Sequence, residues 1–228
     1  DIQRNYLSGH AYKWASPPDK HWLDIKSLWD SSVRRRLKRP MKGRDTPMLV
    51  EKWVEENQPN DPIFKAWSEV RAYRPPPRVD VWLSDYQIED VIRRFEAGEP
   101  VLVFYSGTAV RNRLRDMGLA EVYGPGEAPP STPQAQHTWV SRESHAEGHN
   151  LQAWGRMVIL EPPPSGTAFE QMLGRIHRTG QTRDEVEVYV YCHHELHRSA
   201  FWRAYNKEKD QRTLYGVQRK LLTANILS

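Results

Sequence analysis

The sequence predicts an α/β fold, with a parallel sheet flanked by helices and a helical segment before it. Beyond residue 79, apolar runs of strand length alternate with helical patterns, which is typical of a parallel sheet. One run, Val101–Tyr105, is continuous, as in a strand that is covered on both faces. Upstream the patterns are helical only, and three consecutive prolines in Arg74-Pro-Pro-Pro-Arg78 forbid both helix and central strand. We therefore predict a helical segment over residues 1–78 and an α/β domain over residues 79–228.

Three helices are expected in the first segment. Residues 21–39 carry apolar side chains at nearly helical spacing, and this helix opens after Pro17-Pro18-Asp19 and ends before Pro40. Residues 47–56 and 62–73 each begin with a proline, which suits the first position of a helix.

The second segment alternates strands and helices. The predicted strands are residues 101–105, 121–123, 137–140, 157–160 and 185–192. The predicted helices are residues 85–97, 108–117, 167–178 and, for the most part, 195–222. The first two of these helices are followed by Gly98 and Gly118, because glycine commonly ends a helix.

Composition limits the classes of function. With 228 residues the chain can bury a core, and no apolar stretch approaches the roughly 20 residues that span a bilayer, so we expect no membrane partner. The N-terminus lacks a signal peptide and begins with Asp1, so we interpret the chain as a piece of a longer protein. The single Cys192 favours a reducing compartment, cytoplasmic or nuclear. A net charge of +4 suits a polyanionic partner.

The strongest functional signal is the string Gln171-Met-Leu-Gly-Arg-Ile-His-Arg-Thr-Gly-Gln181. On a helix, Gln171, Arg175 and Arg178 share one face, and Gly174 permits close approach by another group. Two arginines held on one face fit phosphate oxygens. For the arginines alone, a solvated helix end with surface ion pairs is the alternative.

The whole string resembles motif VI of superfamily 2 helicases, and Arg175-Ile-His-Arg-Thr-Gly-Gln-Thr182 looks most like the SWI/SNF branch. The resemblance implies a RecA-like, three-layer lobe, the second motor lobe of an ATP-dependent translocase on double-stranded DNA. It further implies that Arg178 is an arginine finger for the γ-phosphate of ATP, that Arg175 is its partner, and that Gln171 and Gly174 also belong to the nucleotide site.

Residues 141–151 resemble motif V of the same family, including Gly148, Asn150 and Leu151 at its end. Gly148 and Asn150 are thereby also implied in the nucleotide site, although an ordinary turn explains the short Gly-His-Asn stretch equally well by itself.

Motif V also implies contacts with the DNA backbone, for which Ser141 and Arg142 are the candidates. The sequence departs from the family where His145 and Ala146 replace two glycines. Because glycine permits backbone conformations that other residues do not, the geometry of this loop is expected to differ from the family's.

Two further segments are candidate nucleic-acid contacts. Ser106 and Thr108 follow a predicted strand as in motif IV, where a helix N-terminus offers N–H groups to a phosphate; simple N-capping is the alternative. Residues 34–44 hold seven basic residues and no acid, and Arg35 and Arg36 resemble a segment at the end of the family's first lobe. A solvated helix face is the alternative there.

The chain has no G-x-x-x-x-G-K-[ST] string, so no phosphate-cradling loop is predicted within it. The resemblance assigns that loop to the first lobe, which is expected to hold ATP and Mg²⁺ and to be a partner of this chain. We expect the full-length protein to hydrolyse ATP on DNA, and this chain alone to be inactive and to carry no bound cofactor. The stretch Cys192-His-His-Glu-Leu-His197 fits no standard zinc spacing, so no metal site is predicted.

Two other functions remain open from the sequence. One is a non-catalytic nucleic-acid-binding module that keeps a helicase-lobe fold. The other is part of a strand-separating helicase or of a restriction-enzyme motor, which also use Q-x-x-G-R-x-x-R strings.

Overall fold

A computed structural model describes residues 7–38, 45–145, 149–163, 165–216 and 219–224. The chain forms two compact units, which we call the helical unit, Tyr12–Val79, and the α/β unit, Asp80–Ser228 together with Asp1–Ala11. The chain passes between them along β1 (His10–Trp14) and β2 (Arg78–Trp82), which pair as a two-stranded sheet that the sequence did not predict.

The helical unit contains α2 (Lys20–Leu37), α3 (Pro47–Asn57) and α4 (Pro62–Val70), close to the predicted ranges. The residue before each helix caps it, because its side-chain oxygen accepts hydrogen bonds from N–H groups of the first turn. These caps are Asp19, Thr46 and Asp61.

The helical unit has a core of its own. It consists of the buried Trp29, Val33, Val50, Val54 and Phe64, with half-buried neighbours around them. The three helices thus bury one shared apolar stripe, which accounts for their behaviour as a compact body.

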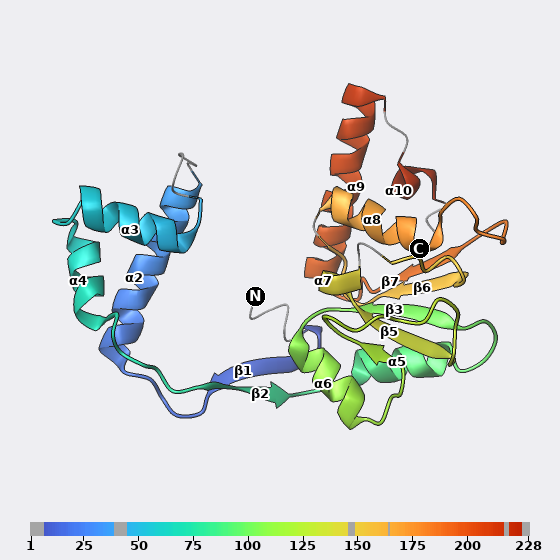
Figure 1. Cartoon of the computed structure of the whole chain (residues 1–228), viewed down its shortest axis with the longest axis horizontal. Coiled ribbons are helices and arrows are strands. Elements are labelled where there is room, and N and C mark those ends of the chain that lie inside the picture. Colours follow the sequence, from blue (N-terminus) through green and yellow to red (C-terminus); the bar gives the residue numbers. More distant parts are fainter. Residues whose placement is uncertain (1–6, 39–44, 146–148, 164, 217–218, 225–228) are drawn as a thin grey trace. The chain divides into compact units, whose positions relative to one another are not determined.

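The α/β unit is built on five parallel strands in the order β4-β5-β3-β6-β7 (Figure 1). The strands are β3 (Val101–Tyr105), β4 (Val122–Tyr123), β5 (His137–Ser141), β6 (Arg156–Ile159) and β7 (Glu187–Val190). All five predicted strands are present and all are parallel, which confirms the α/β fold class. The continuous apolar run forms β3, which lies in the centre of the sheet and is buried throughout.

Helices cover both faces of this sheet, as the three-layer prediction required. The helices are α5 (Tyr86–Arg94), α6 (Thr108–Asp116), α8 (Gly166–Ile176), α9 (Glu195–Tyr215) and α10 (Lys220–Thr223). Val101, Val103 and Tyr105 of β3 join a core cluster with α5 and α6, whereas Leu102 and Phe104 join another with α8, α9 and α10. Alternate residues of a strand point to opposite faces, so one strand serves two cores.

The predicted helix boundaries needed correction in the last third of the chain. The helix predicted over residues 167–178 ends at Ile176, so Arg178 lies beyond it. The helix predicted over residues 195–222 breaks at Gly216, whose left-handed backbone, φ 66°, terminates α9 before the short α10. A one-turn helix, α7 (Arg142–His145), was not predicted.

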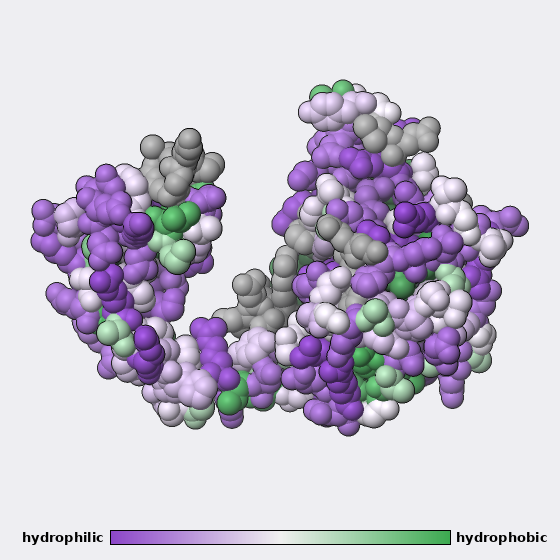
Figure 2. Space-filling model, viewed as in Figure 1, coloured by the Kyte–Doolittle hydropathy of each residue, from purple (hydrophilic) through white to green (hydrophobic). Residues whose placement is uncertain are grey.

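No helix in the described part of the chain is long and apolar enough to cross a bilayer. Hydrophilic residues cover most of the face shown in Figure 2, with hydrophobic residues scattered among them.

Candidate functional site

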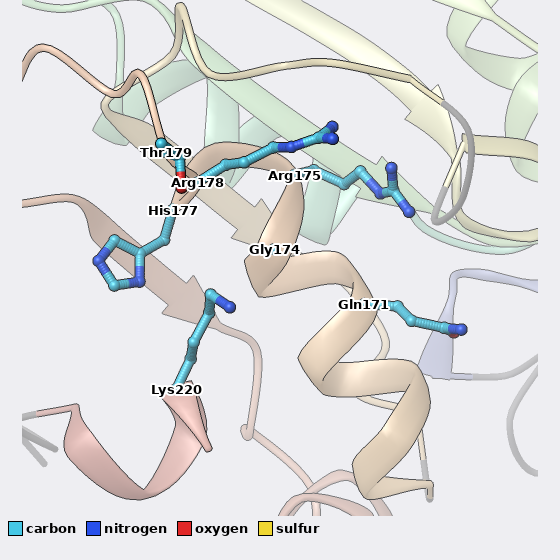
Figure 3. A pocket seen from close by; sticks show the side chains of 7 residues that line it. All are labelled: Gln171, Gly174, Arg175, His177, Arg178, Thr179 and Lys220. Atoms are coloured by element: carbon cyan, nitrogen blue, oxygen red, sulfur yellow. The ribbon is translucent and has the colours of Figure 1, made fainter. Parts of the chain in front are cut away.

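An open hollow of about 630 Å³ lies beside the last turn of α8. It is lined by Gln171, Gly174, Arg175, His177, Arg178, Thr179 and Lys220 (Figure 3). Three of the lining side chains are cationic and none is a carboxylate. Such a composition suits a group with several anionic oxygens.

The end of α8 differs from the prediction that Arg178 would lie on the helix. His177 is the C-cap, and its N–H donates to Leu173 O at 2.9 Å. The side-chain amide of Gln181 donates to Ile176 O at 2.8 Å and so satisfies a carbonyl that the ending helix leaves free. Arg178 therefore reaches the hollow from a turn.

This turn is closed by a hydrogen bond from Gln181 N–H to Arg178 O, at 2.9 Å. Gly180, within the turn, has φ 96°, which an L side chain rarely adopts. Gly180 and Gln181, at the end of the string over residues 171–181, thus set the position of Arg178.

Despite the end of the helix, four of the six residues predicted for the nucleotide site line this hollow, namely Gln171, Gly174, Arg175 and Arg178, and Asn150 does not. Figure 3 shows the side chains of Gln171, Arg175 and Arg178 extending to the same side of α8. The guanidinium of Arg178 is exposed and has no hydrogen-bond or ion-pair partner among the described residues. It is therefore available to an external anion.

Arg175 connects the two motif strings. Its Nη1 donates to His149 O at 3.1 Å, and its own carbonyl accepts from Leu151 N–H at 3.2 Å. Asn150, between them, accepts from Gln152 N–H at 3.4 Å and is exposed, so it shapes the local turn. Gly148 and Ala146 lie outside the described residues.

The predicted nucleic-acid contacts on the sheet lie at its carboxyl edge. Ser106 follows β3 and Ser141 ends β5, and these strands are paired neighbours. Neither Ser106 nor Thr108 caps α6, because Gly107 is the N-cap and no side chain accepts there. The capping alternative is therefore wrong, and Ser106 Oγ is buried without a hydrogen-bond partner among the described residues.

Two of these edge residues are engaged within the unit. Ser141 is buried, and its hydroxyl donates to Glu143 at 3.0 Å. Arg142 donates to Glu161 O at 3.0 Å and pairs with the Glu143 carboxylate at 3.3 Å. The charge of Arg142 is thus partly neutralised by its neighbours.

The hollow and the carboxyl edge lie at opposite ends of the sheet. α8 follows β6, runs back along the sheet, and ends where Gln181 bonds both Ile176 O and Trp154 O. Trp154 precedes β6, so this place is the amino end of that strand. The α/β unit therefore separates its candidate nucleotide residues from its candidate DNA contacts.

Comparison with known proteins gives partial matches. No protein-family model matches the chain. RNA polymerase-associated protein RapA of Haemophilus influenzae is 39% identical over 68 residues in strain Rd and 34% identical over 68 residues in strain PittEE. Each match covers 30% of this chain and 7% of RapA, so the chain spans a small part of these relatives. The crystal structure of the C-terminal part of the Fun30 ATPase domain superposes with a TM-score of 0.37 at 16% identity, over 74% of this chain and 60% of that one.

The two motif strings meet on a five-stranded parallel sheet, in a chain that is similar to RapA over 68 residues.

The remaining predicted contacts, Arg35 and Arg36, lie on α2 of the helical unit. Arg35 is exposed, and no partner for its side chain occurs in the described parts of the chain. Arg36 instead binds Asp61 at 2.7 Å and Gln58 at 3.2 Å, and it contacts Ser32. It holds α2 against the start of α4.

Three residues of the hollow were not predicted from the sequence. His177 and Thr179 stand inside the motif VI string but were given no role. Lys220 lies far along the chain, on α10. Nothing in the sequence signals it, because only the packing of α10 against α8 brings it there.

The described residues contain no group of three or more His, Cys, Asp or Glu arranged to hold a metal ion. Within the stretch that suggested one, His193 and His197 meet edge to face, with ring centroids 5.0 Å apart. Burial lowers the pKa of His193 and raises that of the Cys192 thiol, so both favour their neutral forms.

Proposed function

We propose that the α/β unit is the C-terminal lobe of a superfamily 2 helicase of the SWI/SNF-like branch, and that it acts as the second motor lobe of an ATP-dependent translocase on double-stranded DNA. In this proposal Arg178 and Arg175 reach the phosphates of an ATP molecule bound to a first lobe, with Gln171 and Gly174 beside them. Closure of the lobes on ATP and their opening after hydrolysis would move the protein along the DNA.

The observation that carries the proposal is Arg178, which is exposed, has no partner among the described residues and lies beside Arg175 in a cationic hollow. The hollow fits phosphate groups, because its cations have no carboxylate among the lining residues to compete for them. For the same reason it offers nothing to Mg²⁺, which prefers carboxylate oxygens and water. Mg²⁺ would therefore be held on the first lobe.

Contacts with the DNA backbone are proposed at the carboxyl edge of the sheet and on the helical unit. At the edge, the N–H groups that open α6 and the exposed Thr108 are the best candidates, since Ser106 Oγ is buried and Ser141 and Arg142 already have protein partners. On the helical unit Arg35 is better placed than Arg36, whose guanidinium is occupied. Contacts to phosphates carry no sequence preference, which suits a motor that moves along DNA.

The test is DNA-stimulated ATPase activity of the full-length protein carrying Arg178→Ala. An arginine at the γ-phosphate stabilises charge in the transition state, so we expect kcat to fall by about 10³-fold or more. Arg203→Ala is the matched control, because Arg203 is exposed on α9 and does not line the hollow. Unchanged turnover in Arg178→Ala would refute the finger assignment.

The same protein distinguishes the competing function. A non-catalytic nucleic-acid-binding module would bind DNA with an affinity that ATP does not alter and would show no DNA-stimulated turnover. ATP hydrolysis by this 228-residue chain alone would contradict the expectation that the first lobe supplies the other half of the site.

A further inference from the structure

We propose that Lys220 is a third phosphate ligand of the hollow and that α10 positions it there. The inference rests on the proposed nucleotide function of the hollow and adds to it a residue that lies outside the motif strings. The ligand is a polyphosphate chain, as in a nucleoside triphosphate.

The backbone of Lys220 is fixed to α8 by Glu170. The carboxylate of Glu170 accepts hydrogen bonds from Lys220 N–H at 2.9 Å and from Leu221 N–H at 2.7 Å. Leu221 is buried in the core cluster shared with α8. Glu170 precedes Gln171, so α10 is attached directly beside the hollow.

The residue before Lys220 is anchored as well. Arg219 Nε lies 2.8 Å from Oε2 of the fully buried Glu208, an ion pair whose angle falls outside that of a hydrogen bond. Arg219 also donates to Gln211 at 2.8 Å. The chain is thus anchored on both sides of Lys220, so the position of the Lys220 Cα is restricted.

The ammonium group of Lys220 has no counter-ion within the described residues, although the side chain is half-buried. The nearby Glu170 carboxylate is used by backbone N–H groups and makes no ion pair with it. A partly desolvated cation without a partner gains from an arriving anion, because attraction is stronger where water is displaced.

Figure 3 shows the Lys220 side chain rising from α10 toward His177, with Gly174 between it and the two arginines. A Cβ on Gly174 would meet nothing within 4 Å, so the space between the cations is open. A single phosphate pairs with one or two cations, whereas a chain of phosphates can span cations on two sides of an open hollow. The arrangement therefore favours a polyphosphate.

The test is binding of inorganic tripolyphosphate to the 228-residue chain, measured by calorimetry at low salt. We expect Lys220→Ala to raise the dissociation constant about fivefold, the effect of losing one partly exposed charge-assisted contact. Lys220→Arg keeps the charge and should stay within about twofold of the wild-type value. Lys207→Ala is the matched control, because Lys207 is exposed on α9 and does not line the hollow.

Equal affinities in Lys220→Ala and the Lys207 control would overturn the inference. Arg178→Ala in the same assay separates this failure from failure of the proposed function. If Arg178→Ala weakens binding and Lys220→Ala does not, only the role of Lys220 is lost. If neither weakens it, the hollow is not an anion site and both proposals fail. If Lys220→Ala weakens binding but ATPase activity is indifferent to Arg178→Ala, the anion site stands without the motor function.

Discussion

Arg35 and Arg36 are adjacent in sequence but differ in what they can bind. Arg35 is exposed and unpartnered among the described residues, whereas Arg36 is bound to Asp61. Burial alone would raise the pKa of Asp61, but hydrogen bonds from Phe64 N–H, Arg36 and Ile63 N–H together lower it below its usual value. The basic run over residues 34–44 therefore contains one arginine, Arg35, that is exposed to an external partner, and another, Arg36, that stabilises the fold.

The lowered pKa of Asp61 predicts a pH-dependent stability of the helical unit. A carboxyl group whose pKa is lower in the folded state adds stability that is fully present above about pH 4 and is lost as the pH falls through the folded-state pKa. We expect Asp61→Asn to lower the free energy of unfolding by about 1–2 kcal/mol at pH 7, and by less at pH 3. Urea unfolding followed by tryptophan fluorescence measures this, since Trp29 and Trp67 stack within this unit.

Asp24→Asn is the control for this prediction, because Asp24 is exposed on α2 without a partner in the described residues. A difference between Asp61→Asn and the wild type that stays the same at both pH values would contradict the linkage.

At the scale of elements, α8 is held at both ends by residues from other parts of the chain. At its C-terminal end Gln181 satisfies the carbonyl of Ile176. At its N-terminal end the buried carboxylate of Glu208 lies against Gly166, where a Cβ would overlap Glu208 Oε1. A carboxylate at a helix N-terminus is favoured by the helix dipole, so α9 fixes the start of α8 both electrostatically and by contact.

We predict that Glu208→Gln destabilises the α/β unit by about 3 kcal/mol, because Arg219 loses the partner of an ion pair whose carboxylate is fully buried. Chemical unfolding followed by circular dichroism measures the change. Glu185→Gln is the control, since Glu185 is exposed and has no partner among the described residues. Equal unfolding midpoints for the two variants would show that the pair does not hold α9 and α10 to α8.

At the scale of the whole molecule, the basic excess belongs to the helical unit. Residues 12–79 hold 15 Lys and Arg against nine Asp and Glu, whereas the rest of the chain holds 18 against 20. The helical unit therefore carries a formal charge of +6 and the α/β unit a formal charge of −2. Non-specific attraction to nucleic acid is consequently expected from the helical unit, whereas the α/β unit is expected to act through localised sites.

The connectivity allows this division to be tested by excision. β1 and β2 run in opposite directions (Figure 1), and Ala15 N–H donates to Pro77 O at 2.8 Å. Replacing residues 16–76 with Asn-Gly, a pair that favours tight hairpin turns, should leave the α/β unit folded. We expect unchanged tripolyphosphate binding, weaker DNA binding at low salt, and a salt slope for DNA binding reduced by about one to three.

Loss of cooperative unfolding after the excision would show that the α/β unit needs the helical unit to fold. An unchanged salt slope would place the main DNA contacts on the α/β unit instead.

The sequence by itself determined the fold class, the five strands and the motif VI string. It did so because these depend on local patterns: a continuous apolar run for the central β3, alternation of strands with helices, and a long string of specific residues at 171–181. The end of α8 was predicted wrongly, because the capping amide of Gln181 acts through two carbonyls, one of them on Trp154, which is distant in sequence.

Only the tertiary structure decided which charged residues are free and which are already used. Arg36, Arg142 and Arg219 bind carboxylates from other segments, while Arg178 and Lys220 have no such partner in the described chain. A sequence pattern shows that a cation is present but not what neutralises it, because the partner is brought close by packing between elements. For the same reason Lys220 joined the hollow only when α10 was placed on α8.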